Sequence, residues 1–284
     1  MMTLFDSKQK IEDICIVMLC RDSLSYLEEI EKSFARLEKS YQVNFSYLFL
    51  ENGSHDETSA FIQSFLSKRK GELIHPDPSI PLDSLKRTEK MAFLRNLAKE
   101  KSPTHCSWFM LIDTDIYFDS DILKIMFDHL SNNNEIGMLC ANGLEVIKKK
   151  GLRKYKKRYR GLRKEITTDS QQTFLTQNHY YDTYAYTDLQ GKSHWPHCTY
   201  SACEKCINNE KSEAHQKLKF VTSAFGGIAL IKDELMRNAS MLWSGRDGAN
   251  IEQCEHVEFC KSINEKTAYK VAIAEDALSY WVIP

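Results

Sequence analysis

The sequence of 284 residues contains no long apolar run. Runs such as Phe109 to Ile112 are far shorter than the roughly 20 residues that a membrane-spanning helix needs. The first ten residues, Met1 to Lys10, are polar and lack the apolar centre of a signal peptide. We therefore expect a cytoplasmic protein.

Glycine is scarce, with 11 residues in the chain, and several motifs that depend on it are missing. Neither a glycine-rich dinucleotide-binding motif nor the nucleophile elbow of serine hydrolases occurs. Gly191-Lys192-Ser193 ends like a phosphate-binding loop, but Tyr186 occupies the position of that motif's first glycine and no strand is predicted before it. The usual signals of these three classes are therefore absent, and we find no internal repeats.

An excess of one charge sign is also missing. The formal net charge of -1 gives no overall attraction to nucleic acid, and we expect no nucleic-acid partner. Residues 148–164 are the exception, because Lys or Arg occupies eleven of these seventeen positions. This segment predicts either a solvated, mobile loop or a patch for anionic lipid headgroups, a phosphorylated acceptor or RNA. Peripheral membrane contact through it therefore stays open.

The nine cysteines are an odd number, and several lie inside apolar segments, which indicates reduced thiols. Cys203-Glu204-Lys205-Cys206, with Cys198, His194 and His197 upstream, contains the ligand types of a structural zinc site. No second Cys-x-x-Cys pair accompanies it, so the alternative is a reduced, cysteine-rich loop.

Apolar residues make up 42% of the chain, enough for a substantial core, and we expect one domain over residues 1–284. Apolar runs alternate with segments of helical periodicity, which predicts an α/β fold with a mostly parallel sheet flanked by helices. The predicted strands are 14–19, 45–50, 108–112, 137–140, 225–231 and 269–274, and the predicted helices are 24–37, 57–68, 86–101, one that starts at 119, and 252–263. Ligands of such sheets bind at the carboxyl ends of the strands, where Arg21, Glu51 and Asp113 lie.

Asp113-Thr114-Asp115 follows the apolar strand 108–112 directly. One residue separates the carboxylates, so in extended geometry both side chains share one face. Two hard oxygen ligands suit a divalent cation that bridges a diphosphate, either Mn²⁺ or Mg²⁺. The alternative is that Asp113 and Asp115 only end the strand and open a turn.

Three segments, in this order, resemble GT-A nucleotide-sugar glycosyltransferases. Glu51 to Thr58 is similar to the "D/E-N/D-G-S-x-D-x-T" segment after the second strand of that family, and Lys90 to Asn96 is similar to its "R-N" helix. Leu111 to Tyr117 matches its metal motif. The resemblance implies a Rossmann-like GT-A fold that binds a nucleotide-sugar donor and a divalent metal.

More narrowly, the chain from about residue 14 to 276 resembles the capsule-associated mannosyltransferase-like group and the chlorella-virus glycosyltransferase domain. The segments that carry this narrower resemblance are 140–144, 180–188, 225–227 and 254–260. It implies a nucleotide-sugar half over about residues 14–140 and an acceptor half over about residues 141–284.

The resemblance also implies roles for individual residues. The donor site would include Arg21, Glu51, Asn52, Arg95 and Asp113, the sugar or acceptor site would include Tyr181, Asp182, Asp188, Gly226 and Gly227, and the metal ligands would be Asp113 and Asp115. An inverting reaction also needs a carboxylate base within about 3 Å of the acceptor hydroxyl.

The family reads "E-D" where this sequence has Glu255-His256, so the base stays open between Glu255 and Glu258, and His256 becomes a candidate third metal ligand. If the reaction retains the anomeric configuration, Glu255 need not be a base. The acceptor would be a glycan or a lipid-linked glycan. Two other functions stay open at this stage: a non-catalytic module that binds anionic surfaces, and a sugar nucleotidyltransferase.

Overall fold

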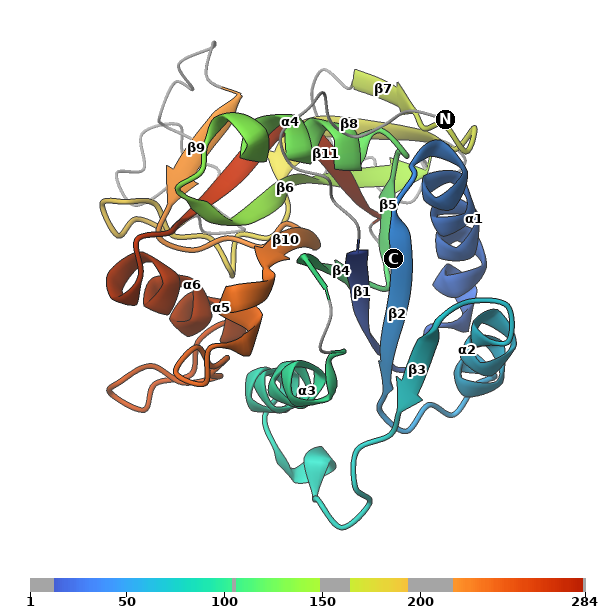
Figure 1. Cartoon of the computed structure of the whole chain (residues 1–284), viewed down its shortest axis with the longest axis horizontal. Helices are drawn as coiled ribbons and strands as arrows, with labels where there is room; N and C mark the ends of the chain where they lie inside the picture. The colour runs from blue at the N-terminus through green and yellow to red at the C-terminus, as the bar shows by residue number, and fades with distance from the viewer. Residues whose placement is uncertain (1–12, 104–105, 149–163, 194–216, 283–284) are drawn as a thin grey trace.

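The computed structural model describes residues 13–103, 106–148, 164–193 and 217–282 (Figure 1). Most of the basic segment 148–164, together with Cys198, Cys203 and Cys206, lies outside the described residues. The strands are β1 (Asp13–Cys20), β2 (Asn44–Glu51), β3 (Gly71–Ile74), β4 (Trp108–Asp113), β5 (Ile116–Phe118), β6 (Ile136–Lys148), β7 (Lys164–Thr167), β8 (Thr173–Tyr180), β9 (Leu218–Val221), β10 (Ile228–Lys232) and β11 (Lys270–Val282). The helices are α1 (Leu24–Ser40), α2 (Thr58–Leu66), α3 (Arg87–Lys101), α4 (Ile122–Asn132), α5 (Asp233–Arg237) and α6 (Glu255–Lys266), with a 3₁₀ turn at Leu82–Ser84.

The sheet has the strand order β3-β2-β1-β4-β10-β6-β11-β5. The first four strands run parallel, and β10 is antiparallel to both β4 and β6. Since β11 is parallel to β6, six of the first seven strands in this order point the same way. The predicted α/β class with a central, mostly parallel sheet is confirmed.

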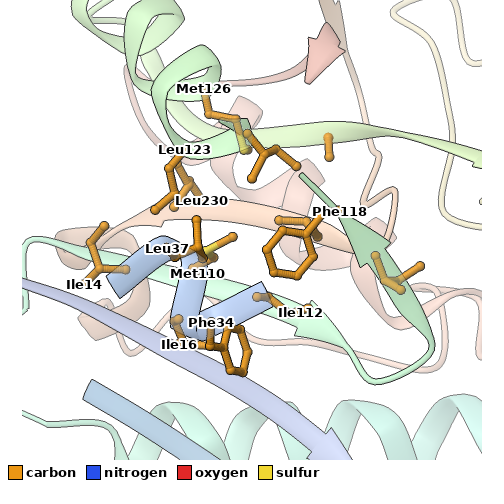
Figure 2. Close-up of a cluster of buried hydrophobic side chains, with 14 of the residues drawn as sticks. Ile14, Ile16, Phe34, Leu37, Met110, Ile112, Phe118, Leu123, Met126 and Leu230 are labelled. Atoms are coloured by element: carbon orange, nitrogen blue, oxygen red, sulfur yellow. The ribbon is translucent and has the colours of Figure 1, made fainter. Parts of the chain in front are cut away.

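Helices cover both faces of this sheet and enclose two apolar layers. One layer holds α1, α2 and α4, and Figure 2 shows part of it: Phe34 and Leu37 of α1 lie close to Ile16 of β1 and Met110 of β4. The other layer contains buried residues of α3, α5 and α6. The central strands are buried on both faces, which explains why β1 and β4 are almost uninterrupted apolar runs.

The two long strands β6 and β11 pair with each other, and each also pairs with two further strands. Their first parts lie beside β10 and β9, while their later parts pair with β8 and β5, across a register shift between Ala274 and Leu278 of β11. This bend places Trp281, near the end of β11, beside β5 and therefore beside the Asp113-Thr114-Asp115 turn between β4 and β5.

All of the predicted strands and helices are present, with shifted ends. The largest shifts are at the ends of β6 and β11, which continue to Lys148 and Val282 instead of ending at residues 140 and 274. Strand β10 begins at Ile228 instead of Phe225, because Gly226 and Gly227 adopt φ angles of 68° and 77°. A positive φ breaks the extended strand and is adopted readily by glycine alone. Strands β3, β5, β7, β8 and β9 and helix α5 were not predicted, since most of them are short. Among the described residues, no helix is long and apolar enough to cross a membrane.

Candidate active site

The carboxyl ends of β1, β2 and β4 lie side by side. Cys20 pairs with Glu51, and Leu19 pairs with Asp113, so the three strands end at one edge of the sheet. The prediction that Arg21, Glu51 and Asp113 meet at this edge is confirmed.

Hydrogen bonds join the loops that follow β1, β2 and β4. The hydroxyl of Ser23 donates to Oγ1 of Thr114 at 3.2 Å, and the backbone N–H of Ser23 donates to Oγ1 of Thr58 at 2.8 Å. The backbone N–H of Asp22 donates to Ser54 at 2.9 Å. The turn that carries the two acids is therefore hydrogen-bonded to the loop after β1, which is hydrogen-bonded in turn to the loop after β2.

Asp113 and Asp115 occupy a tight turn between β4 and β5. The backbone N–H of Asp113 donates to the carbonyl of Gly227 at 2.9 Å, and Nε1 of Trp281 donates to Oδ2 of Asp115 at 2.8 Å. Among the residues that the structure describes, no group of three His, Cys, Asp or Glu side chains could hold a metal ion. Two carboxylates suit Mg²⁺ or Mn²⁺ that completes its coordination with substrate phosphates and water.

Arg95 of α3 links this turn to the start of α6. Its Nε donates to Oε1 of Glu255 at 3.0 Å, and its Nη2 lies 3.4 Å from Oδ1 of Asp113. The guanidinium also lies over the ring of Phe225, 4.9 Å from the centroid. Arg95 is 5% exposed, so this cation is compensated by Glu255 and Asp113 inside the protein and not by water.

These contacts give the two carboxyl groups opposite pKa shifts. Burial raises the pKa of Asp113 to about 7. The nearby carboxylates also raise this pKa, and the two effects together outweigh the opposing charge of the Arg95 guanidinium. For Glu255 the burial is outweighed by the interaction with His256, followed by the charge and the hydrogen bond of Arg95, and its pKa falls to about 2. Glu255 also accepts a weak hydrogen bond from the thiol of Cys254 at 3.7 Å. A carboxylate held so firmly in its charged form is a weak proton acceptor.

His256 is 2% exposed, and its ring stacks on Phe225 with the centroids 4.0 Å apart. Its Nε2 lies 3.6 Å from Oε1 of Glu255, but neither ring nitrogen has a hydrogen-bond partner. Burial, followed by the charge of Arg95, lowers the pKa of His256 to about 3, so the ring is neutral at pH 7. Its role as a third metal ligand stays a prediction.

Glu258, the other predicted base, is half-buried and accepts a hydrogen bond from Nε2 of Gln253 at 3.3 Å. This contact is with the residue before Cys254 and not with Arg95 or with the turn between β4 and β5. Its catalytic role also stays a prediction.

Gly226 and Gly227 bring the chain against the two-acid turn. A Cβ atom on Gly226 would lie 2.1 Å from the carbonyl oxygen of Ala141, and one on Gly227 would lie 2.6 Å from both Ile116 and the hydroxyl of Tyr181. Only glycine fits at either position. The backbone N–H of Gly226 donates to Oδ2 of Asp182 at 3.0 Å.

Tyr181 and Asp182 therefore lie next to the turn, and their role in binding the sugar or the acceptor stays a prediction. The ring of Tyr181 stacks on Trp281 at 5.5 Å, and Trp281 in turn holds Asp115. Burial raises the pKa of Asp182 to about 6, in spite of the hydrogen bond from Gly226. A half-buried carboxylate with this pKa can both bind and deprotonate a hydroxyl.

Asp188 has different surroundings. It is 2% exposed, and its Oδ1 accepts the backbone N–H groups of Gln190 and Lys192 at 2.9 and 2.7 Å. These bonds close a local turn, which is the structural alternative to sugar binding for this residue.

An open pocket of about 400 Å³ lies between the carboxyl ends of β1 and β2 and the first half of α3. Its lining residues are Leu19, Cys20, Arg21, Asn52, Leu85, Arg87, Lys90, Met91 and Leu94. Two predicted donor-binding residues, Arg21 and Asn52, are among them. Glu51 is not, because its carboxylate is buried and lies 3.0 Å from Nδ1 of His75, while it also accepts the backbone N–H of Ser54.

Sequence reasoning missed the basic residues Arg87 and Lys90. Their signal is present in the helical spacing, because positions 87, 90, 91 and 94 recur at the three- and four-residue intervals of one helix face. That face is the one that α3 turns toward the pocket.

No protein-family model matches the sequence, and no curated protein matches it. The fold is similar to that of TarS residues 1–349 from S. aureus, at 10% identity and a TM-score of 0.52, covering 95% of this chain and 60% of that chain. The complex of TarS 1–349 with UDP-GlcNAc gives 11% identity, a TM-score of 0.51, and coverage of 96% and 59%. The mannosyltransferase PcManGT from Pyrobaculum calidifontis, in complex with GDP-Man and Mn²⁺, gives 11% identity, a TM-score of 0.53, and coverage of 95% and 57%.

This chain thus spans less than two thirds of the length of each of these structures. At such identities the likeness shows the fold alone. Two of these structures contain a nucleotide sugar, UDP-GlcNAc in TarS 1–349 and GDP-Man in PcManGT. The narrower resemblance to the capsule-associated and chlorella-virus groups stays a prediction.

Proposed function

We propose that this chain is a metal-dependent glycosyltransferase that moves a sugar from a nucleoside-diphosphate donor to a glycan or lipid-linked glycan. The observation that carries the proposal is the position of Asp113 and Asp115 at the same sheet edge as the pocket lined by Arg21 and Asn52. A donor that enters this pocket would have its diphosphate at this edge of the sheet, between the basic residues of the pocket and the two acids. The similar folds that contain nucleotide sugars support this assignment.

In this proposal the nucleotide-sugar half covers about residues 14–140 and the acceptor half about residues 141–284. Asp115 and Asp113 would hold Mn²⁺ or Mg²⁺, which neutralises the charge that develops on the departing diphosphate. Trp281 orients the carboxylate of Asp115, and Tyr181 supports Trp281 by stacking. A sugar ring would lie near Gly226 and Gly227, whose lack of side chains lets this part of the chain lie close to Ala141, Ile116 and Tyr181 beside the two-acid turn.

Arg95 acts here as a positioning residue instead of a direct donor contact, because its guanidinium is buried against Glu255 and Asp113. Glu255 correspondingly serves to hold Arg95. Asp182 would bind an acceptor hydroxyl, and its raised pKa suits that contact.

The test measures thermal unfolding of the purified chain with Mn²⁺ and a panel of UDP- and GDP-sugars, followed by assays for slow donor hydrolysis. We expect one donor class to raise the melting temperature only when the metal is present, and Asp115→Ala to remove that stabilisation. If no donor stabilises the chain, the alternative of a non-catalytic module for anionic surfaces is favoured. Release of pyrophosphate in place of a nucleoside diphosphate would favour the nucleotidyltransferase alternative.

A further inference from the structure

Two cations from different elements converge on one oxygen atom at the pocket. Nη1 of Arg21, in the loop after β1, donates to Oδ1 of Asp83 at 3.0 Å. Nζ of Lys90, on α3, donates to the same oxygen at 2.8 Å. The hydrogen bonds from Lys90 and then Arg21 lower the pKa of Asp83 to about 2, so the carboxylate stays charged.

The three partners differ in how firmly the protein holds them. The side chain of Asp83 is 82% exposed, whereas that of Lys90 is 16% exposed and that of Arg21 is 37% exposed. Asp83 projects from a short 3₁₀ turn, Leu82–Ser84, which is anchored by the buried side chain of Leu82. The cations therefore belong to the pocket wall, while the carboxylate lies at its outer side and can turn into solvent.

The pocket wall has an unbalanced charge. Its lining includes Arg21, Arg87 and Lys90 and no carboxylate residue. The start of α3 lies at the same wall, since the helix begins at Arg87 and both Arg87 and Lys90 line the pocket, as does Leu85 just before it. The positive end of the helix dipole therefore adds to the positive electrostatic potential in the pocket. Asp83 is the acid that neutralises part of this charge in the free protein.

We propose that Arg21 and Lys90 form a binding site for a phosphate group of the ligand, and that Asp83 occupies this site as a built-in competitor until the ligand displaces it. The inference rests on the proposed function only in taking the ligand to be a nucleoside diphosphate. An anion in the pocket accepts the two charge-assisted hydrogen bonds from Arg21 and Lys90 in place of Asp83, and the released carboxylate of Asp83 is hydrated by water. Because exposed ion pairs are individually weak, the competition is mild and lowers affinity by about fivefold.

The experiment measures binding of inorganic pyrophosphate without metal, and of UDP and GDP with Mn²⁺, by isothermal titration calorimetry. The variants are Asp83→Asn, which removes the competitor, and Lys90→Gln and Arg21→Gln, which remove the cations. Asp77→Asn is the matched control. Asp77 is also an exposed acid before α3, and it accepts a hydrogen bond from the backbone N–H of Ser79 at 2.8 Å, not from a cation of the pocket.

We expect Asp83→Asn to bind pyrophosphate about fivefold more tightly than the unaltered chain, and Lys90→Gln and Arg21→Gln to bind it more weakly. The double variant Asp83→Asn with Lys90→Gln should lose most of the gain. An Asp83→Asn variant that binds with unchanged or weaker affinity would overturn the proposal. An equal gain in Asp77→Asn would also overturn it, because the effect would then come from net charge alone.

The outcomes also separate this inference from the proposed function. If pyrophosphate follows the expected pattern but no nucleotide binds, the anion site stands and the glycosyltransferase proposal fails. If UDP or GDP binds with Mn²⁺ but Asp83→Asn leaves its affinity unchanged, the glycosyltransferase proposal stands and Asp83 is only a surface ion-pair partner. Circular dichroism of each variant confirms that it is folded.

Discussion

Nε of Arg95 donates to Oε1 of Glu255 at 3.0 Å, and both side chains are buried, with exposed fractions of 5% and 6%. The pair joins α3 to the N-terminus of α6 across 160 residues of sequence. Because Arg95 also contacts Asp113, the same cation fixes the end of β4. The geometry of the two-acid turn thus depends on the packing of two helices that bear none of its acids.

Replacing Arg95 by Met should destabilise the fold strongly, because Glu255 would be left as a buried carboxylate without its cation and the half-buried Asp113 would lose the same partner. Breaking a buried ion pair in this way costs about 3–5 kcal/mol. The measurement is urea unfolding at pH 7. Arg246→Met is the control, since Arg246 forms a partly exposed pair with Glu89 at 2.7 Å and its loss should cost much less than the loss of Arg95. Similar losses in the two variants would contradict the buried-pair argument.

Gly226 and Gly53 allow a second comparison, because both have a φ of 68° but very different surroundings. Gly53→Ala meets no atom within 4 Å, so it should cost only the roughly 1–2 kcal/mol of a left-handed residue. Gly226→Ala places its Cβ 2.1 Å from the carbonyl oxygen of Ala141 and should cost about 1–3 kcal/mol more through overpacking. Urea midpoints of the two variants test this. Equal midpoints would show that the backbone at Gly226 relaxes without loss.

The sequence was sufficient to predict the centre of the fold. Strands β1 and β4 are buried on both faces, so their apolar runs are unbroken, and the order of strands and helices then places Arg21, Glu51 and Asp113 at one edge. Short strands such as β5 carry too few residues for a periodic pattern. The length of β11 was also not predictable, because its second part depends on a register shift after Ala274.

The candidate site was predictable only in part. The residues of the two-acid turn are contiguous in sequence, whereas the partners of Arg95 and Lys90 are set by tertiary packing. Helical spacing places Lys90 and Arg87 on one face of α3 but does not say that Asp83 will turn back onto Lys90. Likewise, the resemblance left the base open between Glu255 and Glu258, and only the structure shows that Glu255 accepts a hydrogen bond from the guanidinium of Arg95.

Trp281 should affect metal binding without touching the metal. Its Nε1 donates to Oδ2 of Asp115, and removing such a partner of a ligand typically lowers metal affinity by about 10–100-fold. Trp281→Phe should therefore weaken Mn²⁺ binding in the presence of UDP, measured by electron paramagnetic resonance of free Mn²⁺. Trp108→Phe, at the opposite end of β4, should leave this affinity unchanged. A normal affinity in Trp281→Phe would show that this hydrogen bond does not orient the ligand.

Glu51 should make the stability of the fold depend on pH in the acidic range. Its carboxylate is buried, but hydrogen bonds from Ser54 and the nearby His75 outweigh the burial and lower the pKa below the ordinary value of 4.5. The unfolded chain therefore takes up this proton at a higher pH than the folded chain does. The stabilisation by Glu51 is fully present above about pH 4.5 and is lost as the pH falls through the lowered value.

Urea unfolding at pH 7, 5, 4 and 3 tests this dependence. Glu51→Gln should be less stable than the unaltered chain at pH 7. The amide of Gln has a single acceptor oxygen, so it cannot accept hydrogen bonds from both Ser54 and His75 as the carboxylate does. The difference in stability should shrink toward pH 3. Glu72→Gln is the control, since Glu72 is an exposed acid on the neighbouring strand β3. A difference between Glu51→Gln and the unaltered chain that stays constant from pH 7 to 3 would mean that the amide loses packing or hydrogen bonds and that the charge of Glu51 contributes nothing.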